Sequence, residues 1–126
     1  METDGTVTTG FGEGGKFLQI DFYESKFSEI LGSVPYHGTL NIIISDENIK
    51  MINSIKKNSE IIKGENNFGS VKYIKAILNN EIKGLILFPE KSTHKENCLE
   101  FIAITNLREK LNLKDNDKVN LKITTW

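Results

Sequence analysis

A glycine-rich motif near the start of the chain has the composition of a phosphate-binding loop. It runs from Gly10 to Phe17 through Phe11, Gly12, Glu13, Gly14, Gly15 and Lys16. Glycine lets backbone N–H groups approach a phosphate closely because it has no Cβ. The motif therefore indicates a site for the phosphates of a nucleotide, with a flexible hairpin turn as the structural alternative.

A second motif, residues 35–41, places a hydroxyl and an amide two positions apart, at Thr39 and Asn41. In an extended segment these side chains point to the same side, while Leu40 points to the other. Oxygen ligands of this kind suit Mg²⁺, which completes its shell with water and phosphate oxygens. An exposed strand with polar side chains on its solvent face is the alternative.

The spacing of Gly10, Gly12 and Gly15 also matches the dinucleotide-binding fingerprint, which requires a helix directly after the loop. We expect a strand there instead, because Leu18, Ile20 and Phe22 alternate with polar residues. The sequence thus argues against that fold and favours a strand–loop–strand arrangement, similar to the glycine-rich lid of protein kinases.

The remaining chain consists of short elements that must position these motifs. Strand patterns occupy residues 5–9, 17–22, 39–45, 68–78, 82–88, 98–104 and 118–124, with residues 60–63 a shorter candidate. Asn79 and Asn80 indicate a hairpin turn between two of them. Helical patterns occupy residues 23–31, 49–55 and 106–111; Gly32 ends the first, and Ser45 or Asp46 caps the second.

We expect six or seven strands and three short helices, without regular alternation of strand and helix. This order favours a mainly β fold, a small β-barrel, over a doubly wound sheet. The length of 126 residues fits a single domain spanning residues 1–126. Because a strand pattern begins within a few residues of Met1, the chain could be a trimmed piece of something longer, and the sequence leaves open whether an upstream regulatory domain was removed.

Composition excludes several function classes. The formal net charge is −1 and the lysines form no patch, which argues against a nucleic-acid partner. The single cysteine, Cys98, cannot form an internal disulfide and fits a reducing cytoplasm. No apolar run is long enough to span a membrane, and residues 1–9 do not form a secretory signal. We therefore expect a cytoplasmic protein without a membrane partner.

Taken together, the two motifs resemble those of the archaeal CTP-dependent riboflavin kinases. The resemblance extends over residues 68–72, residues 84–94 and residues 107–115, and covers about residues 5–123. It implies a six-stranded cradle-loop β-barrel that transfers the γ-phosphate of CTP to the 5′-hydroxyl of riboflavin, giving FMN and CDP. It also implies a monomer whose partners are these small molecules.

The resemblance assigns roles by position. Thr39 and Asn41 would bind Mg²⁺, and Ser92 and Glu100 would contact the flavin. Nucleotide contacts would come from Phe11, Gly12, Glu13, Gly14, Gly15 and Lys16 on one side, and from Thr105, Asn106, Leu107 and Arg108 on the other. Three positions depart from the family pattern: Lys16, His37 and Ser92.

Phosphoryl transfer requires positioning, charge neutralisation and removal of the acceptor proton. Glu100 is our first candidate for the base because the family places it by the flavin, and Glu13 is the second. We expect His37 and His94 to be solvated loop residues, Cys98 a small buried residue and Trp126 a frayed end. Two alternatives remain open: a non-catalytic barrel that senses flavin or nucleotide, and a DNA-binding barrel, which the charge argues against.

Overall fold

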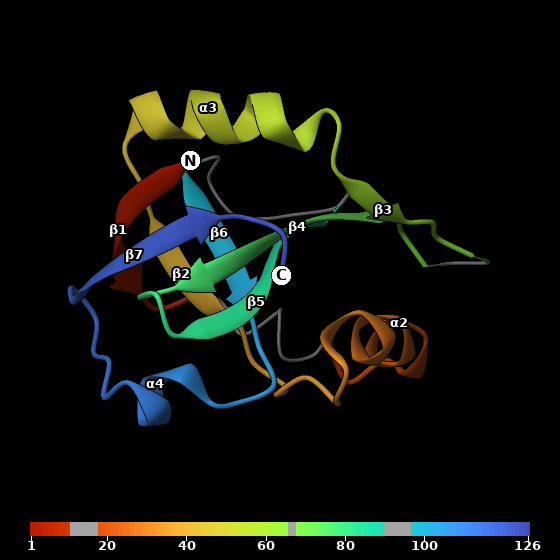
Figure 1. Cartoon of the computed structure of the whole chain (residues 1–126). Helices are drawn as coiled ribbons and strands as arrows, with labels where there is room; N and C mark the ends of the chain where they lie inside the picture. Colours follow the sequence, from red (N-terminus) through yellow and green to blue (C-terminus); the bar gives the residue numbers. More distant parts are fainter. Residues whose placement is uncertain (11–17, 66–67, 90–96) are drawn as a thin grey trace.

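The computed structural model describes residues 1–10, 18–65, 68–89 and 97–126. Within these ranges the chain forms seven strands and three helices (Figure 1). The strands are β1 (Glu2–Thr8), β2 (Leu40–Ile43), β3 (Glu60–Ile62), β4 (Val71–Leu78), β5 (Ile82–Pro89), β6 (Cys98–Ile102) and β7 (Lys118–Ile123). The helices are α2 (Asp21–Leu31), α3 (Asp46–Lys56) and α4 (Leu107–Lys110).

Six of the strands close into a barrel. The strand order is β3-β4-β5-β6-β2-β1-β7, and an additional pairing of β4 with β7 closes the ring. β4 makes this possible because it changes partner along its length: residues 71–73 pair with β3 and residues 76–78 pair with β7. The prediction of a mainly β, six-stranded barrel is thus confirmed, with β3 as a short addition outside the ring.

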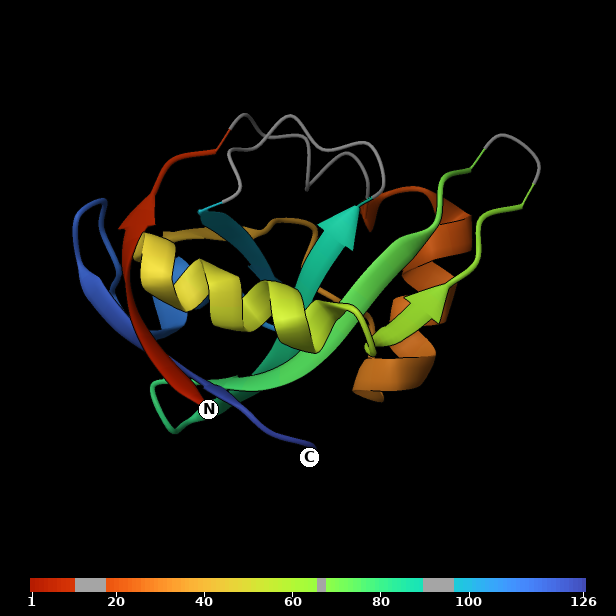
Figure 2. The ribbon, with the colours of Figure 1, turned by 90° about the horizontal axis from the view of Figure 1, so that it is seen from above.

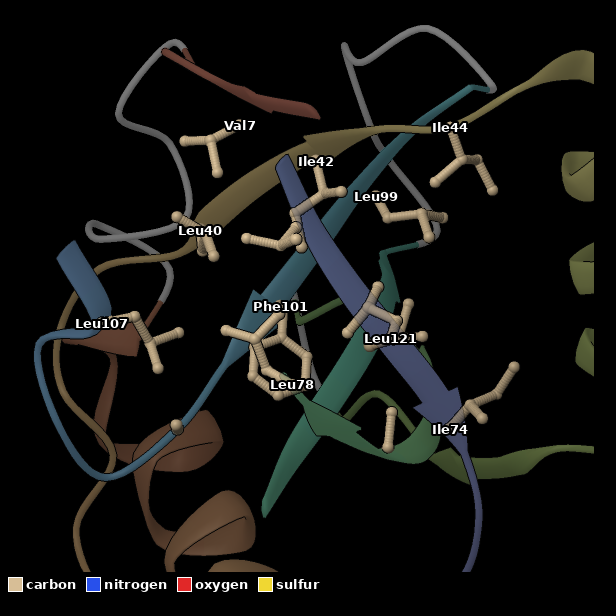
Figure 3. Packing of buried hydrophobic residues seen from close by; sticks show 14 of the residues in the cluster. Val7, Leu40, Ile42, Ile44, Ile74, Leu78, Leu99, Phe101, Leu107 and Leu121 are labelled. Atoms are coloured by element: carbon tan, nitrogen blue, oxygen red, sulfur yellow. The ribbon is translucent and has the colours of Figure 1, made fainter. Parts of the chain in front are cut away.

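The interior of the barrel is filled by alternate residues of its strands. Leu40, Ile42 and Ile44 from the β2 segment point inward together with Phe101 and Leu121 (Figure 3). Ile49 and Ile52 of α3 and Leu107 of α4 join the same cluster. Figure 1 shows these two helices on opposite sides of the strands. The helices therefore extend the barrel core at two of its sides.

A second apolar cluster lies on the outer face of the barrel wall. Tyr23 and Phe27 of α2 pack there against Leu85, Leu87 and Ile102. Figure 2 shows α2 and α3 on different sides of the barrel. No helix in the described ranges is long and apolar enough to cross a membrane.

The strand predicted at residues 17–22 is wrong. Leu18 is in a helical turn, and α2 begins at Asp21. The fully buried side chains here are Leu18 and Phe27, with Tyr23 nearly so, a spacing that belongs to a helix face rather than to a two-residue alternation. Asp21 and Glu24 also favour a helix start at this point. The predicted strand–loop–strand arrangement is therefore not formed. The doubly wound fold is still excluded, because all described strand pairs are antiparallel.

The predicted turn and cap residues are largely confirmed. Asn79 and Asn80 adopt positive φ angles of 50° and 55° in the β4–β5 hairpin. The Ser45 side chain accepts a hydrogen bond from the Asn48 N–H at the start of α3. Gly32, with a φ of 82°, ends α2. The other predicted strands are present, with ends that differ by up to three residues.

Trp126 is not frayed, contrary to the prediction. Its indole Nε1 donates a hydrogen bond to the Gly84 carbonyl at 3.1 Å. The Lys75 ammonium lies 4.7 Å from the centre of the ring. The side chain also packs against the outer apolar cluster beneath α2. These contacts fix residues after β7 to the barrel wall.

We predict that Trp126→Phe lowers the free energy of unfolding by about 1 kcal/mol, because it removes the indole donor and keeps an aromatic ring. Trp126→Ala should cost more, since it also removes the packing and the contact with Lys75. Chemical denaturation measures both, with exposed Thr125→Ala as the control. Unchanged stability in both Trp126 variants would show that the contact with Gly84 contributes nothing.

Candidate active site

Asn41 occupies the middle of a polar row on the outer wall of the barrel. In the antiparallel ladders it lies directly opposite Thr8 of β1 on one side and Glu100 of β6 on the other. Directly opposed residues have Cβ atoms roughly 4.5–5.5 Å apart. Because Leu40 and Ile42 point into the core, Asn41 must point outward. The register thus brings together one hydroxyl, one amide and one carboxylate.

The Asn41 side chain is buried but incompletely hydrogen-bonded. The residue is 7% exposed, and its Oδ1 has no hydrogen-bond partner among the described residues. A buried polar atom without a partner costs free energy, so such an atom needs an explanation. An amide oxygen with a free lone pair is a suitable ligand for a hard cation. The donor set therefore fits the predicted Mg²⁺ site.

Gly10 makes room for this side chain. A Cβ built on Gly10 would lie 2.4 Å from Asn41 Nδ2 and 2.7 Å from Asn41 Oδ1, closer than real atoms approach. The composition of this glycine-rich motif predicts phosphate binding. At Gly10 the structure shows a different requirement, namely close packing of the β1 end against Asn41.

Thr39 lies at a pocket next to this row. The pocket has a volume of about 480 Å³ and is bounded by Thr39 and the segment that starts α4. All four residues predicted to contact a nucleotide from this side line it: Thr105, Asn106, Leu107 and Arg108. The structure therefore brings one predicted metal ligand and one predicted nucleotide segment to the same place, although they are 66 positions apart along the chain.

Arg108 connects the pocket to the end of β1. Its Nη2 donates to the Thr8 carbonyl at 3.2 Å and to Asp115 Oδ1 at 2.7 Å. The Thr9 hydroxyl donates to the other Asp115 oxygen at 2.5 Å. These hydrogen bonds, from Thr9 first and then from Arg108, hold the pKa of Asp115 below its usual value. Asp115 is not among the site residues that the sequence predicts, so this connection was missed.

Glu100 is 5% exposed on the outer wall, beside Asn41 and next to Leu87 of β5. Its charge also contributes, after burial, to a raised pKa of the half-buried Cys98 thiol. The position is compatible with the predicted base role.

Several predicted residues fall outside the described part of the chain. These are Phe11, Gly12, Glu13, Gly14, Gly15, Lys16, Ser92 and His94. Of the two histidines, His37 is described; it is an exposed loop residue, as predicted, and its Nε2 lies within hydrogen-bond distance of Glu24 Oε2 of α2. No cluster of three or more His, Cys, Asp or Glu side chains suited to a metal occurs within the described ranges. A metal site formed by Thr39 and Asn41 would contain none of these four residue types.

These features define a small antiparallel β-barrel with a row of polar side chains on its outer wall and a pocket beside that row. A family model for CTP-dependent riboflavin kinases, described as "Domain of unknown function DUF120", matches residues 7–123. The chain therefore belongs to the CTP-dependent riboflavin kinase family, and it is a kinase.

Curated relatives extend over nearly the whole chain. A riboflavin kinase of Methanobrevibacter smithii is 52% identical over 123 residues, which cover 97% of this chain and 99% of the relative. A riboflavin kinase of Methanothermobacter thermautotrophicus is 45% identical over 119 residues, covering 94% and 96%. A riboflavin kinase of Saccharolobus solfataricus is 35% identical over 129 residues, covering 98% and 74%. The resemblance seen in the sequence is thus confirmed.

We predict that Gly10→Ala lowers kinase turnover on the order of 10²-fold, because a displacement of about 1 Å at a positioning group has that effect. The added Cβ must push Asn41 away from its place beside Glu100. Steady-state turnover measures the loss, and thermal unfolding measures any change in stability.

Gly32→Ala is the matched control for this substitution. Gly32 has a φ of 82° but open space around the added Cβ, so the change strains a helix end without touching Asn41. We expect lower stability and normal turnover for Gly32→Ala. Normal turnover in Gly10→Ala would contradict the positioning of Asn41 by Gly10.

Proposed function

We propose that this kinase transfers the γ-phosphate of CTP to the 5′-hydroxyl of riboflavin, giving FMN and CDP. The observation that carries the proposal is the buried Oδ1 of Asn41, which has no hydrogen-bond partner in the described part of the chain; Asn41 lies in register with Glu100. The family and the names of the relatives support riboflavin as the acceptor and CTP as the donor. The partners we propose are therefore small molecules, and we expect the protein to act as a monomer.

Asn41 Oδ1 and the Thr39 hydroxyl would hold a magnesium ion. When bound, Mg²⁺ supplies positive charge against the β- and γ-phosphate oxygens of the nucleotide. Two neutral protein ligands leave room in its shell for those oxygens and for water. Burial of Asn41 keeps its side chain in one place, so the oxygen is positioned before the ligand arrives.

The pocket beside Thr39 would hold the nucleotide. Both hydrogen bonds of Arg108 within the described residues use Nη2, and a guanidinium has five N–H donors in all. Arg108 therefore has donors left for a phosphate or for the ribose. Backbone groups of residues 105–108 would contact the cytosine edge. The residues Phe11, Gly12, Glu13, Gly14, Gly15 and Lys16 would contribute backbone N–H groups to the phosphates.

Glu100 would act as the base and Ser92 would contact the flavin. In the proposed step the 5′-oxygen of riboflavin forms a bond to the γ-phosphorus, and the bond between that phosphorus and the β,γ-bridging oxygen breaks. CDP leaves with the electron pair of the broken bond. The proton of the 5′-hydroxyl passes to the Glu100 carboxylate, which is close to Asn41 by register.

The test is FMN formation from riboflavin and Mg²⁺, run in parallel with CTP and with ATP. We expect FMN with CTP and little with ATP. FMN with ATP alone would contradict the donor assignment. Flavin binding without FMN from either nucleotide would overturn the kinase reaction in favour of a sensing barrel.

Substitutions separate the metal ligands from the flavin site. We predict that Thr39→Ala and Asn41→Ala each lower turnover far more than they weaken riboflavin binding, because the ligands act on the phosphates. Asn120→Ala is the matched control, since Asn120 Oδ1 is also buried and has no partner among residues 1–10, 18–65, 68–89 and 97–126, but lies on β7, outside the row. Equal losses of turnover and riboflavin affinity in the Asn41 variant would contradict its assignment as a metal ligand.

A further inference from the structure

Tyr36 is an exposed aromatic side chain at the same pocket. It is 45% exposed and lines the pocket together with Thr39, Asn106 and Arg108. An aromatic ring of this size usually buries much of its surface in a core or an interface. Tyr36 belongs to neither of the two apolar clusters among the described residues. Its exposed ring is therefore available to a ligand in the pocket.

The Tyr36 ring is held in place although it is exposed. The backbone N–H donates to the Ala103 carbonyl at 2.9 Å, which attaches this segment to the end of β6. The hydroxyl accepts a hydrogen bond from Asn106 Nδ2 at 3.1 Å. Asn106 is itself fixed, because its Oδ1 accepts from the Glu109 N–H at the start of α4. Hydrogen bonds thus hold Tyr36 at its backbone N–H and at its hydroxyl.

Gly38 lies against the ring. The Gly38 N–H donates to the Tyr36 carbonyl at 2.9 Å, so the chain turns back at this point. A Cβ on Gly38 would lie 2.9 Å from Tyr36 Cε1. Any larger residue at this position would push the ring away. The short segment between Tyr36 and Thr39 therefore combines a fixed ring with the predicted metal ligand.

Two apolar residues near the Tyr36–Ala103 hydrogen bond in sequence are also exposed. Val34 is 56% exposed and Ile104 is 53% exposed. Val34 is two positions before Tyr36, and Ile104 directly follows Ala103, whose carbonyl accepts the Tyr36 N–H. The polar residues Thr105 and Arg108 line the same pocket as Tyr36. The pocket thus combines an exposed aromatic ring with polar side chains, as the base and the phosphorylated sugar of a nucleotide require.

We propose that the Tyr36 ring is the stacking surface for the nucleobase of the donor nucleotide. This inference rests on the proposed function, because it requires a nucleotide in the pocket. Stacking of a base on an aromatic side chain is tolerant of base identity. Tyr36 therefore supplies affinity, while contacts to the base edge supply the preference for cytosine.

The test compares two probes, CDP and inorganic pyrophosphate, both with Mg²⁺ and both measured by calorimetric titration. Loss of a stacked aromatic weakens binding roughly tenfold to a hundredfold. We expect this loss for CDP in Tyr36→Leu and no change for pyrophosphate, which has no base. Tyr36→Phe keeps the ring and should retain most of the affinity. Phe68→Leu, at an exposed aromatic residue outside this pocket, is the control.

A spectroscopic readout separates stacking from a structural role. In the complex with the parent protein and with Tyr36→Phe, the cytosine H5 and H6 resonances should shift upfield, and the shift should disappear with Tyr36→Leu. Unchanged CDP affinity in Tyr36→Leu would overturn the inference. Equal weakening of CDP and pyrophosphate would also overturn it, because the residue would then act on the fold of the pocket.

The outcome is distinguishable from that of the proposed function. If FMN forms from CTP but CDP affinity is indifferent to Tyr36→Leu, the stacking inference alone fails. If CDP affinity depends on the ring but no FMN forms with any nucleotide, the proposed reaction fails and the stacking inference stands.

Discussion

The site depends on the register of β2 in the barrel wall. Leu40, Ile42 and Ile44 fill the interior, so the intervening Asn41 must face outward between Thr8 and Glu100. A slip of one residue would exchange the two faces, placing Asn41 in an apolar core and isoleucines at the polar row. The free energy of core packing therefore also fixes the position of the polar row. Gly10 completes the arrangement because a side chain there would occupy the space of Asn41.

A second constraint joins distant parts of the chain around the pocket. Arg108 binds the Thr8 carbonyl and Asp115, while Thr9 binds the same carboxylate. The end of β1, the start of α4 and the turn before β7 are thus held as one unit. Tyr36 is connected to this unit through Asn106. The segment that contains Thr39 and the segment that contains Arg108 therefore keep a fixed separation, as a bound nucleotide would require.

Much of the barrel could be predicted because its signals are local. Alternating apolar residues, the Asn79–Asn80 turn and the Ser45 cap act over a few positions, and all are confirmed. The prediction of a strand at residues 17–22 was wrong because the spacing of Leu18, Ile20 and Phe22 is compatible with both a strand and a helix. Packing of these residues in the outer cluster favours the helix. The links made by Gly10, Asp115 and Trp126 are set by tertiary contacts. Neighbouring residues in the sequence carry no signal for them.

The most direct test of this account is paramagnetic broadening by Mn²⁺ with CDP in ¹⁵N-labelled protein, referenced to Mg²⁺ with CDP. The account predicts selective loss of the Asn41 side-chain amide signal and of the backbone amides near Thr39. The Asn120 side-chain amide, on β7, should remain sharp. Broadening centred elsewhere, with sharp signals from Asn41, would contradict the assignment of the metal–nucleotide site to the outer wall of β2.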